Sequence, residues 1–267
     1  MIRDITIGQY YPVDSCIHRL DPRVKLLGTL IYVVSLFVVD NAVGYLVGGL
    51  ALGVVIYLSR VPVTYIMRGL KPILFLLCFS VALNVFLTPG ETVLLQLGFL
   101  RVTWEGLTRA FFMGIRLIFL IMGSSLMTFT TTPNQLTDGL ETGLRALKKV
   151  GVPVHEIAMM MSIALRFIPI LIEETDKIMK AQMARGADFE SGNVLQRAKA
   201  LLPILVPLFI SSFRRASDLA MAMEARCYHG GEGRTKMKPL KYKRTDLIAY
   251  GILAAYLVLM ILLGILF

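Results

Sequence analysis

The chain has 267 residues, of which 56% are apolar and 17% charged, and its mean hydropathy is +0.69. A soluble domain averages about 25% charged residues, so this composition excludes a disordered chain and argues strongly against an ordinary soluble globule. The 28 lysines and arginines exceed the 18 acidic residues by 10, and their positions must show whether they face nucleic acid, lipid or one side of a membrane.

Long charge-free apolar runs recur along the chain, and a helix needs roughly 20 such residues to cross a bilayer. Residues 26–59 contain one charge and would make a helix of about 51 Å, so they predict two short spans with a turn at Asp40–Asn41. Three further runs follow, at 72–90, 117–137 and 247–267. The helix of the 117–137 run is expected to begin earlier, near Leu107. The sequence therefore predicts an all-α, polytopic membrane protein with five transmembrane helices.

The basic residues are distributed unevenly between the loops. If the N-terminus lies inside, segments 1–25, 60–71 and 131–246 hold 4, 3 and 18 of them, which is 25 of the 28. Cytoplasmic loops carry such an excess. We therefore predict a cytoplasmic N-terminus and an external C-terminus, and the net charge needs no nucleic-acid partner.

This topology predicts three regions along the chain. Residues 1–132 form a membrane domain of four spans, 133–246 form a cytoplasmic domain of amphipathic helices, and 247–267 form the last span. Helices are expected at 136–150, 157–186 and from near Val194 to Arg226. The apolar parts of the last two, 157–172 and 200–213, contain proline and are marginal for crossing. They favour the membrane interface or packing beneath the spans, and a crossing hairpin is the alternative, which the positive-inside bias opposes.

Two features of the spans predict close contacts. Gly44, Gly48, Gly49 and Gly53 follow the small-xxx-small spacing, which predicts packing within this chain or against a separate membrane protein. Arg116 lies at membrane depth, where a charged side chain usually faces protein or water. It is a candidate buried charge with either a structural hydrogen-bonding role or a functional one.

Two helix ends carry the same pattern. Ala184-Arg185-Gly186 and Ala225-Arg226-Cys227 each place an arginine between two small residues, at the end of helices that look parallel. One such arginine is usually a solvated cap. The duplication adds some weight to a docking role, in which an unshielded guanidinium enters a partner's groove and binds a carboxylate or backbone carbonyls, and the solvated cap stays the alternative.

Motifs for chemistry are missing from the sequence. It contains no G-x-x-x-x-G-K-[ST] phosphate loop and no H-E-x-x-H or C-x-x-C pattern, so we expect no ATP hydrolysis, no catalytic residue, no metal site and no cofactor in this chain. Cys16 with His18, and Cys227 with His229, are interpreted as incidental pairs. The near absence of acidic residues from the spans argues against autonomous transport.

Several motifs together resemble one family. They are the two arginine triplets, His18–Lys25, Thr130-Thr131-Thr132-Pro133, Gly151–Ile157 and Ser162–Pro169. In this combination, which covers nearly the whole chain, the sequence resembles the transmembrane T component of energy-coupling factor (ECF) transporters.

The resemblance implies a non-catalytic scaffold in a prokaryotic cell (inner) membrane. Such a scaffold links two cytoplasmic ABC-type ATPases, identical or different, which bind the ATP, to a small membrane-embedded subunit that binds a vitamin or metal ion for uptake. The two triplets would end coupling helices that dock in the ATPase grooves, and Cys227 is a small residue in place of the glycine. The alternatives are a self-sufficient secondary transporter or channel and, more weakly, a membrane enzyme.

Overall fold

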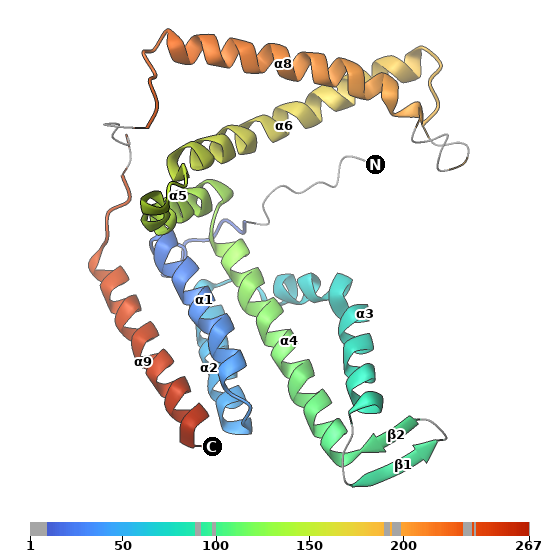
Figure 1. Cartoon of the computed structure of the whole chain (residues 1–267), viewed down its shortest axis with the longest axis vertical. Helices are drawn as coiled ribbons and strands as arrows, with labels where there is room; N and C mark the ends of the chain where they lie inside the picture. Colours follow the sequence, from blue (N-terminus) through green and yellow to red (C-terminus); the bar gives the residue numbers. More distant parts are fainter. Residues whose placement is uncertain are drawn as a thin grey trace. The chain divides into compact units, whose positions relative to one another are not determined.

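The structure is a computed structural model that describes residues 10–88, 92–97, 100–189, 193, 199–231, 237 and 239–266. Its elements appear in Figure 1. The helices in chain order are α1 (Pro22–Val38), α2 (Ala42–Ser59), α3 (Val63–Leu87), α4 (Trp104–Thr130), α5 (Pro133–Gly143), the 3-10 helix η1 (Leu144–Val150), α6 (Val154–Ala184), α8 (Leu202–Glu224) and α9 (Arg244–Leu266). The all-α class is confirmed. A small antiparallel hairpin, β1 (Val93–Leu97) and β2 (Leu100–Thr103), joins α3 to α4 and was not predicted.

The chain divides into two compact units. One, which we name the inserted unit, comprises Leu140–Pro239, and the other, the membrane unit, comprises Gly8–Gly139 with Leu240–Phe267. The divisions lie seven residues from the expected 132/133 and 246/247 boundaries, because the start of α5 and the segment before α9 pack within the membrane unit.

Five of the described helices are long and apolar enough to cross a membrane: α2, α3, α4, α6 and α9. The 17 residues of α1 also suffice for a short span. The polytopic prediction is therefore confirmed, although α6 qualifies by length and composition in addition to the predicted runs.

Two spans begin earlier than their charge-free runs. α3 begins at Val63 and includes Arg68, Lys71 and Pro72, since basic side chains near a helix end can extend their charge toward water. The helix bends (Figure 1), and proline is the usual cause of such a bend. α4 begins at Trp104, after Thr103 accepts a hydrogen bond from the Gly106 N–H as an N-cap.

The membrane unit is a bundle in which α1, α2, α4 and α9 lie side by side and α3 packs on α4 (Figure 1). A small core of Val61, Ile66, Leu126 and Phe129 closes one end. Many apolar side chains of these helices point outward, such as Leu30, which is 58% exposed. An apolar outer surface of this kind suits a lipid environment.

The inserted unit is built on two long helices, α6 and α8. The Gln182 side chain donates a hydrogen bond to the Pro203 carbonyl at 3.3 Å, and Ser211 donates to Glu174 at 3.1 Å. Glu174 also forms an ion pair with Arg215. Since residue numbers rise along α6 as their partners' numbers fall along α8, the two helices are antiparallel, and the parallel arrangement suggested by their sequences is wrong.

Other helix bounds in this unit differ from the predictions. The helix expected at 136–150 is α5 followed by a 3-10 helix, and Gly151 ends the latter with a φ of +85°. The second long helix of this unit, α8, has Pro203 in its first turn, a position where a helix tolerates proline. Residues 194–198, where this helix was expected to start, lie outside the described residues.

Candidate functional site

The first arginine triplet forms the end of α6. Arg185 is the C-cap, and Gly186 follows in the left-handed region with a φ of +89°. The Gly186 N–H donates to the Met183 carbonyl and the Ala187 N–H to the Gln182 carbonyl, both at 3.0 Å. This pair of bonds is a Schellman motif, which satisfies the carbonyls that a helix end leaves free.

The second triplet forms the end of α8 with the same geometry. The Cys227 N–H donates to the Glu224 carbonyl at 2.9 Å, and the Tyr228 N–H donates to the Met223 carbonyl at 3.0 Å. Cys227 has a φ of +56°, which a residue with a Cβ adopts at a cost of roughly 1–2 kcal/mol. The third position of each triplet therefore has a left-handed backbone, and small size alone does not describe what it requires.

Both arginines project from these ends into open surroundings. The six residues of the two triplets are exposed, and within the described part of the chain neither the Arg185 nor the Arg226 guanidinium has a hydrogen-bond or ion-pair partner. Gln182 lies beside Pro203, so the end of α6, with Arg185, lies near the start of α8, and Arg226 follows the other end of α8. Figure 1 shows the two helices. At 1.5 Å per residue, the length of α8 separates the two arginines by about 35 Å.

Apolar surface connects the two ends. A groove between α6 and α8 is lined mainly by apolar side chains, among them Ile163, Phe167, Leu171, Leu219, Ala220 and Met223, and also by Ser212 and Arg215. The first half of α8 also presents a stripe of side chains that are each more than half exposed. They are Leu202, Leu205, Val206, Phe209, Ile210 and Phe213. Their spacing places them on one helix face, so α8 is amphipathic with an unpartnered apolar side.

Arg116 has partners within the membrane unit. Its Nε donates to the Tyr45 hydroxyl at 2.9 Å, and its Nη2 donates to the Val39 carbonyl at 3.4 Å and forms an ion pair with Asp40. The guanidinium also lies over the Phe37 and Tyr45 rings. Arg116 thus ties α4 to the turn between α1 and α2.

The glycines of α2 have different surroundings. An added Cβ would overlap Val39 at Gly44 and would lie 3.3 Å from Leu36 at Gly48 and 2.9 Å from Phe119 at Gly49, whereas nothing lies within 4 Å at Gly53. Gly44, Gly48 and Gly49 therefore allow contacts within the chain, and Gly53 faces open space.

The cysteines and histidines do not gather into a metal centre within the described ranges. No group of three or more His, Cys, Asp or Glu side chains there has suitable geometry, and Cys16, Cys78 and Cys227 are exposed. His18 is buried, with Nδ1 at 2.7 Å from the Ser15 hydroxyl and Nε2 at 3.1 Å from the Tyr11 carbonyl. Burial, and then the charge of Lys25, lower the pKa of His18 below 6.5, so the neutral ring donates from Nε2 and accepts at Nδ1.

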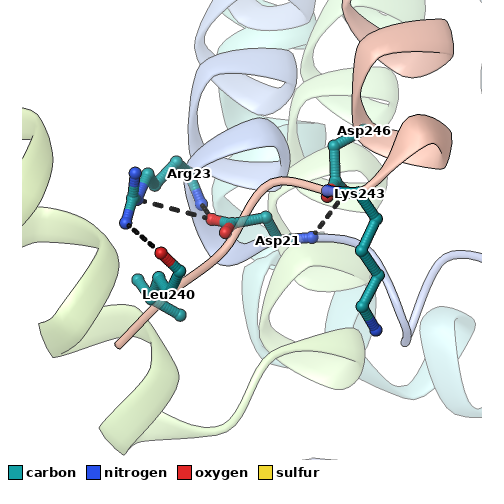
Figure 2. Close-up of polar contacts among 5 residues, drawn as sticks. All are labelled: Asp21, Arg23, Leu240, Lys243 and Asp246. Atoms are coloured by element: carbon teal, nitrogen blue, oxygen red, sulfur yellow. Dashed lines mark hydrogen bonds and ion pairs between the residues drawn. The ribbon is translucent and has the colours of Figure 1, made fainter. Parts of the chain in front are cut away.

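A polar cluster at the start of α1 and α9 escaped the sequence analysis. Asp246, which is 1% exposed, accepts hydrogen bonds from the Asp21 N–H at 3.0 Å and the Lys243 N–H at 2.7 Å (Figure 2). Asp21 caps α1 by accepting from the Arg23 N–H at 3.0 Å. The Arg23 side chain reaches the Leu240 carbonyl at 3.4 Å. The available signal was a lone aspartate in the first turn of an apolar helix, where a carboxylate suits the free N–H groups.

Comparison with known proteins identifies the family of this chain. Residues 14–237 match the family model CbiQ, described as cobalt transport protein. A relative from Clostridium kluyveri is 60% identical over 250 residues, which are 93% of each chain. Relatives from Ruminiclostridium cellulolyticum and Bacillus subtilis are 53% and 48% identical over 98% and 96% of this chain and 98% of each relative. All three are named energy-coupling factor transporter transmembrane protein EcfT. The chain therefore belongs to the CbiQ cobalt transport protein family, together with these energy-coupling factor transporter transmembrane proteins.

Proposed function

We propose that this chain is the non-catalytic transmembrane scaffold of an ECF-type importer. It couples ATP hydrolysis by two partner ABC-type ATPases to a small membrane subunit that binds a vitamin or a metal ion. The ATP, and the residues that hydrolyse it, belong to the partners. The names of the relatives, which are transporter membrane components, support this assignment.

The two arginine ends carry the proposal. Each presents a guanidinium that has no partner within the described residues, on a helix end whose backbone is fixed by a Schellman motif. A rigid end moves as one body with the groove that holds it, so a displacement of the partner passes into the helix. The separation of about 35 Å suits two docking sites on two ATPase subunits better than one.

The distribution of charge supports a cytoplasmic location for these ends. If α1 to α4 cross the membrane in succession, the start of α1, the end of α2 and the end of α4 lie on the same side. The segments on that side hold 25 of the 28 basic residues, which the positive-inside rule assigns to the cytoplasm. The N-terminus is then cytoplasmic as well.

The apolar face of α8 gives the scaffold a surface for its other neighbours. Among the described residues, its exposed stripe is apolar and the groove beside α6 is lined mainly by apolar side chains, with Arg215 already paired to Glu174. We therefore assign substrate selection to the separate membrane subunit and assign to this surface contact with lipid or with that subunit.

Charge reversal at both ends tests the proposal. Arg185→Glu combined with Arg226→Glu places two carboxylates where the partners are expected to offer acceptors, so the ATPases should no longer co-purify with the chain from membranes. Lys180→Glu combined with Arg214→Glu is the matched control, because both residues are exposed on the same two helices and the net charge changes equally. The control should retain the ATPases. Retention by the arginine variant at the wild-type level would sink the proposal.

A further inference from the structure

Two peptide connections join the inserted unit to the membrane unit among the described residues, at 139/140 and at 239/240. A force that partners exert on the described residues of the inserted unit, and that the backbone carries, passes through these points. Both connections are held, on the membrane unit's side, by the same six residues of the chain, Asp21–Leu26. We name this segment the anchor turn.

The first connection is held by close packing. Gly139, near the end of α5, lies against α1 so closely that an added Cβ would be 3.0 Å from Leu26 Cδ1 and 3.3 Å from Pro22 Cβ. Thr137, two residues earlier, is 3% exposed. Glycine at position 139 therefore lets the α5 backbone rest directly on the anchor turn.

The second connection is held by polar contacts. Arg23 Nη2 donates to the Leu240 carbonyl at 3.4 Å, and its guanidinium lies 4.8 Å from the centre of the Tyr242 ring (Figure 2). Six residues after Leu240, Asp246 accepts hydrogen bonds from the residues that precede α1 and α9, Asp21 and Lys243. One buried carboxylate thus joins the starts of both helices.

The anchor turn is also fixed to the rest of the membrane unit. Lys25 Nζ donates to the Thr130 carbonyl at 2.8 Å and to the His18 carbonyl at 3.1 Å. Thr130 is the last residue of α4. The start of α1, the end of α4 and the start of α9 therefore form one hydrogen-bonded assembly.

We propose that the anchor turn is the joint through which displacement of the inserted unit reaches the membrane helices, with Arg23 and Gly139 as positioning residues. This inference rests on the proposed function, because it assumes that partner ATPases displace the inserted unit. It adds a location for the transfer of movement that lies far along the chain from the docking arginines. Weakening the joint should leave docking and ATP hydrolysis intact, but movement of the inserted unit should no longer reach the membrane helices.

Hydrogen exchange tests the joint in the complex of this chain with its ATPases and membrane subunit, measured with and without a non-hydrolysable Mg-ATP analogue. The transported substrate need not be known for this measurement. In the wild-type complex, nucleotide should change the exchange of backbone amides in α6 and α8 and also in α1 and α4. With Arg23→Ala or Gly139→Val, we expect the change in α1 and α4 to fall at least twofold, while the change in α6 and α8 persists and the ATPases still co-purify.

Each variant has a matched control. Arg19→Ala removes an exposed arginine that pairs with Asp14, and Gly143→Val introduces the same side chain four residues further along α5, where nothing lies within 4 Å. Both controls should respond to nucleotide as the wild type does.

Three results would overturn the joint. One is a wild-type complex whose membrane helices do not respond to nucleotide. The second is an unchanged response in both variants. The third is loss of folding or assembly in both variants while the controls assemble, because the anchor turn would then be merely structural. Retention of the ATPases by the Arg185→Glu and Arg226→Glu variant would contradict the proposed function and would leave the joint's own variants unaffected, so the two failures are distinguishable.

Discussion

Replacing Asp246 with alanine removes the acceptor for two backbone N–H groups, those of Asp21 and Lys243. The carboxylate is 1% exposed, so water cannot readily replace it. An unsatisfied buried N–H costs about 1–3 kcal/mol, and the two together give a loss of about 2–6 kcal/mol. Asp246→Asn keeps one carbonyl acceptor and turns an NH2 group toward the other donor, so it should lose about half as much.

Thermal unfolding of the purified protein in detergent measures this loss. A change of 1 kcal/mol shifts the Tm of a protein of this size by roughly 2–4 °C, so Asp246→Ala should lower the Tm by roughly 4–24 °C. Asp14→Ala, at a side chain that is 88% exposed, should leave it almost unchanged. A Tm for Asp246→Ala within the error of the wild type would contradict this prediction, because it would mean that neither N–H group depends on this carboxylate.

Three further predictions concern other contacts. Cys227→Gly should increase the stability by about 1 kcal/mol and so raise the Tm slightly, whereas Gly186→Val should lower the Tm, because both positions have positive φ. A lower Tm for Cys227→Gly or a higher Tm for Gly186→Val would contradict this. Arg116→Met should cost about 1.5–3 kcal/mol, because the guanidinium bonds to a hydroxyl, a carbonyl and a carboxylate, and Arg116→Lys should recover only part of that in the same unfolding assay. The pKa of His18 is lower in the folded protein than its ordinary 6.5, so the unfolded chain takes up the proton first and stability should fall as the pH drops below about 6.5. His18→Gln should remove that part of the pH dependence, and an unaltered pH profile of the Tm would count against it.

Hydrophobic runs predicted most of the membrane helices, because burial in lipid depends on composition and length. The start of α3 was missed since Arg68 and Lys71 interrupt its charge-free run, although a helix continues through such residues near its end. The β1–β2 hairpin was missed because two short strands leave little periodic signal. The end of α6 was predicted more closely than these elements, because a glycine that follows a helix often adopts the left-handed conformation, as Gly186 does.

The candidate site was predictable in its residues and not in its geometry. The arginine triplets stand out as a repeated pattern, but their shared Schellman motifs and the antiparallel order of α6 and α8 depend on contacts such as that of Gln182 with Pro203. The anchor turn was beyond sequence reasoning, because Asp21 and Asp246 lie 225 residues apart. A single chain shows no pairing of such distant positions until the fold brings them together.

Photocross-linking in native membranes shows whether the two arginine ends contact ATPase subunits. A photoreactive amino acid in place of Ala184 or Ala225 leaves each neighbouring arginine intact, and the same residue in place of Arg214, which is exposed on the middle of α8, reports background. We expect adducts with ATPase subunits from both ends and much weaker ones from position 214. Adducts that never contain an ATPase, or that form equally at all three positions, would contradict this expectation.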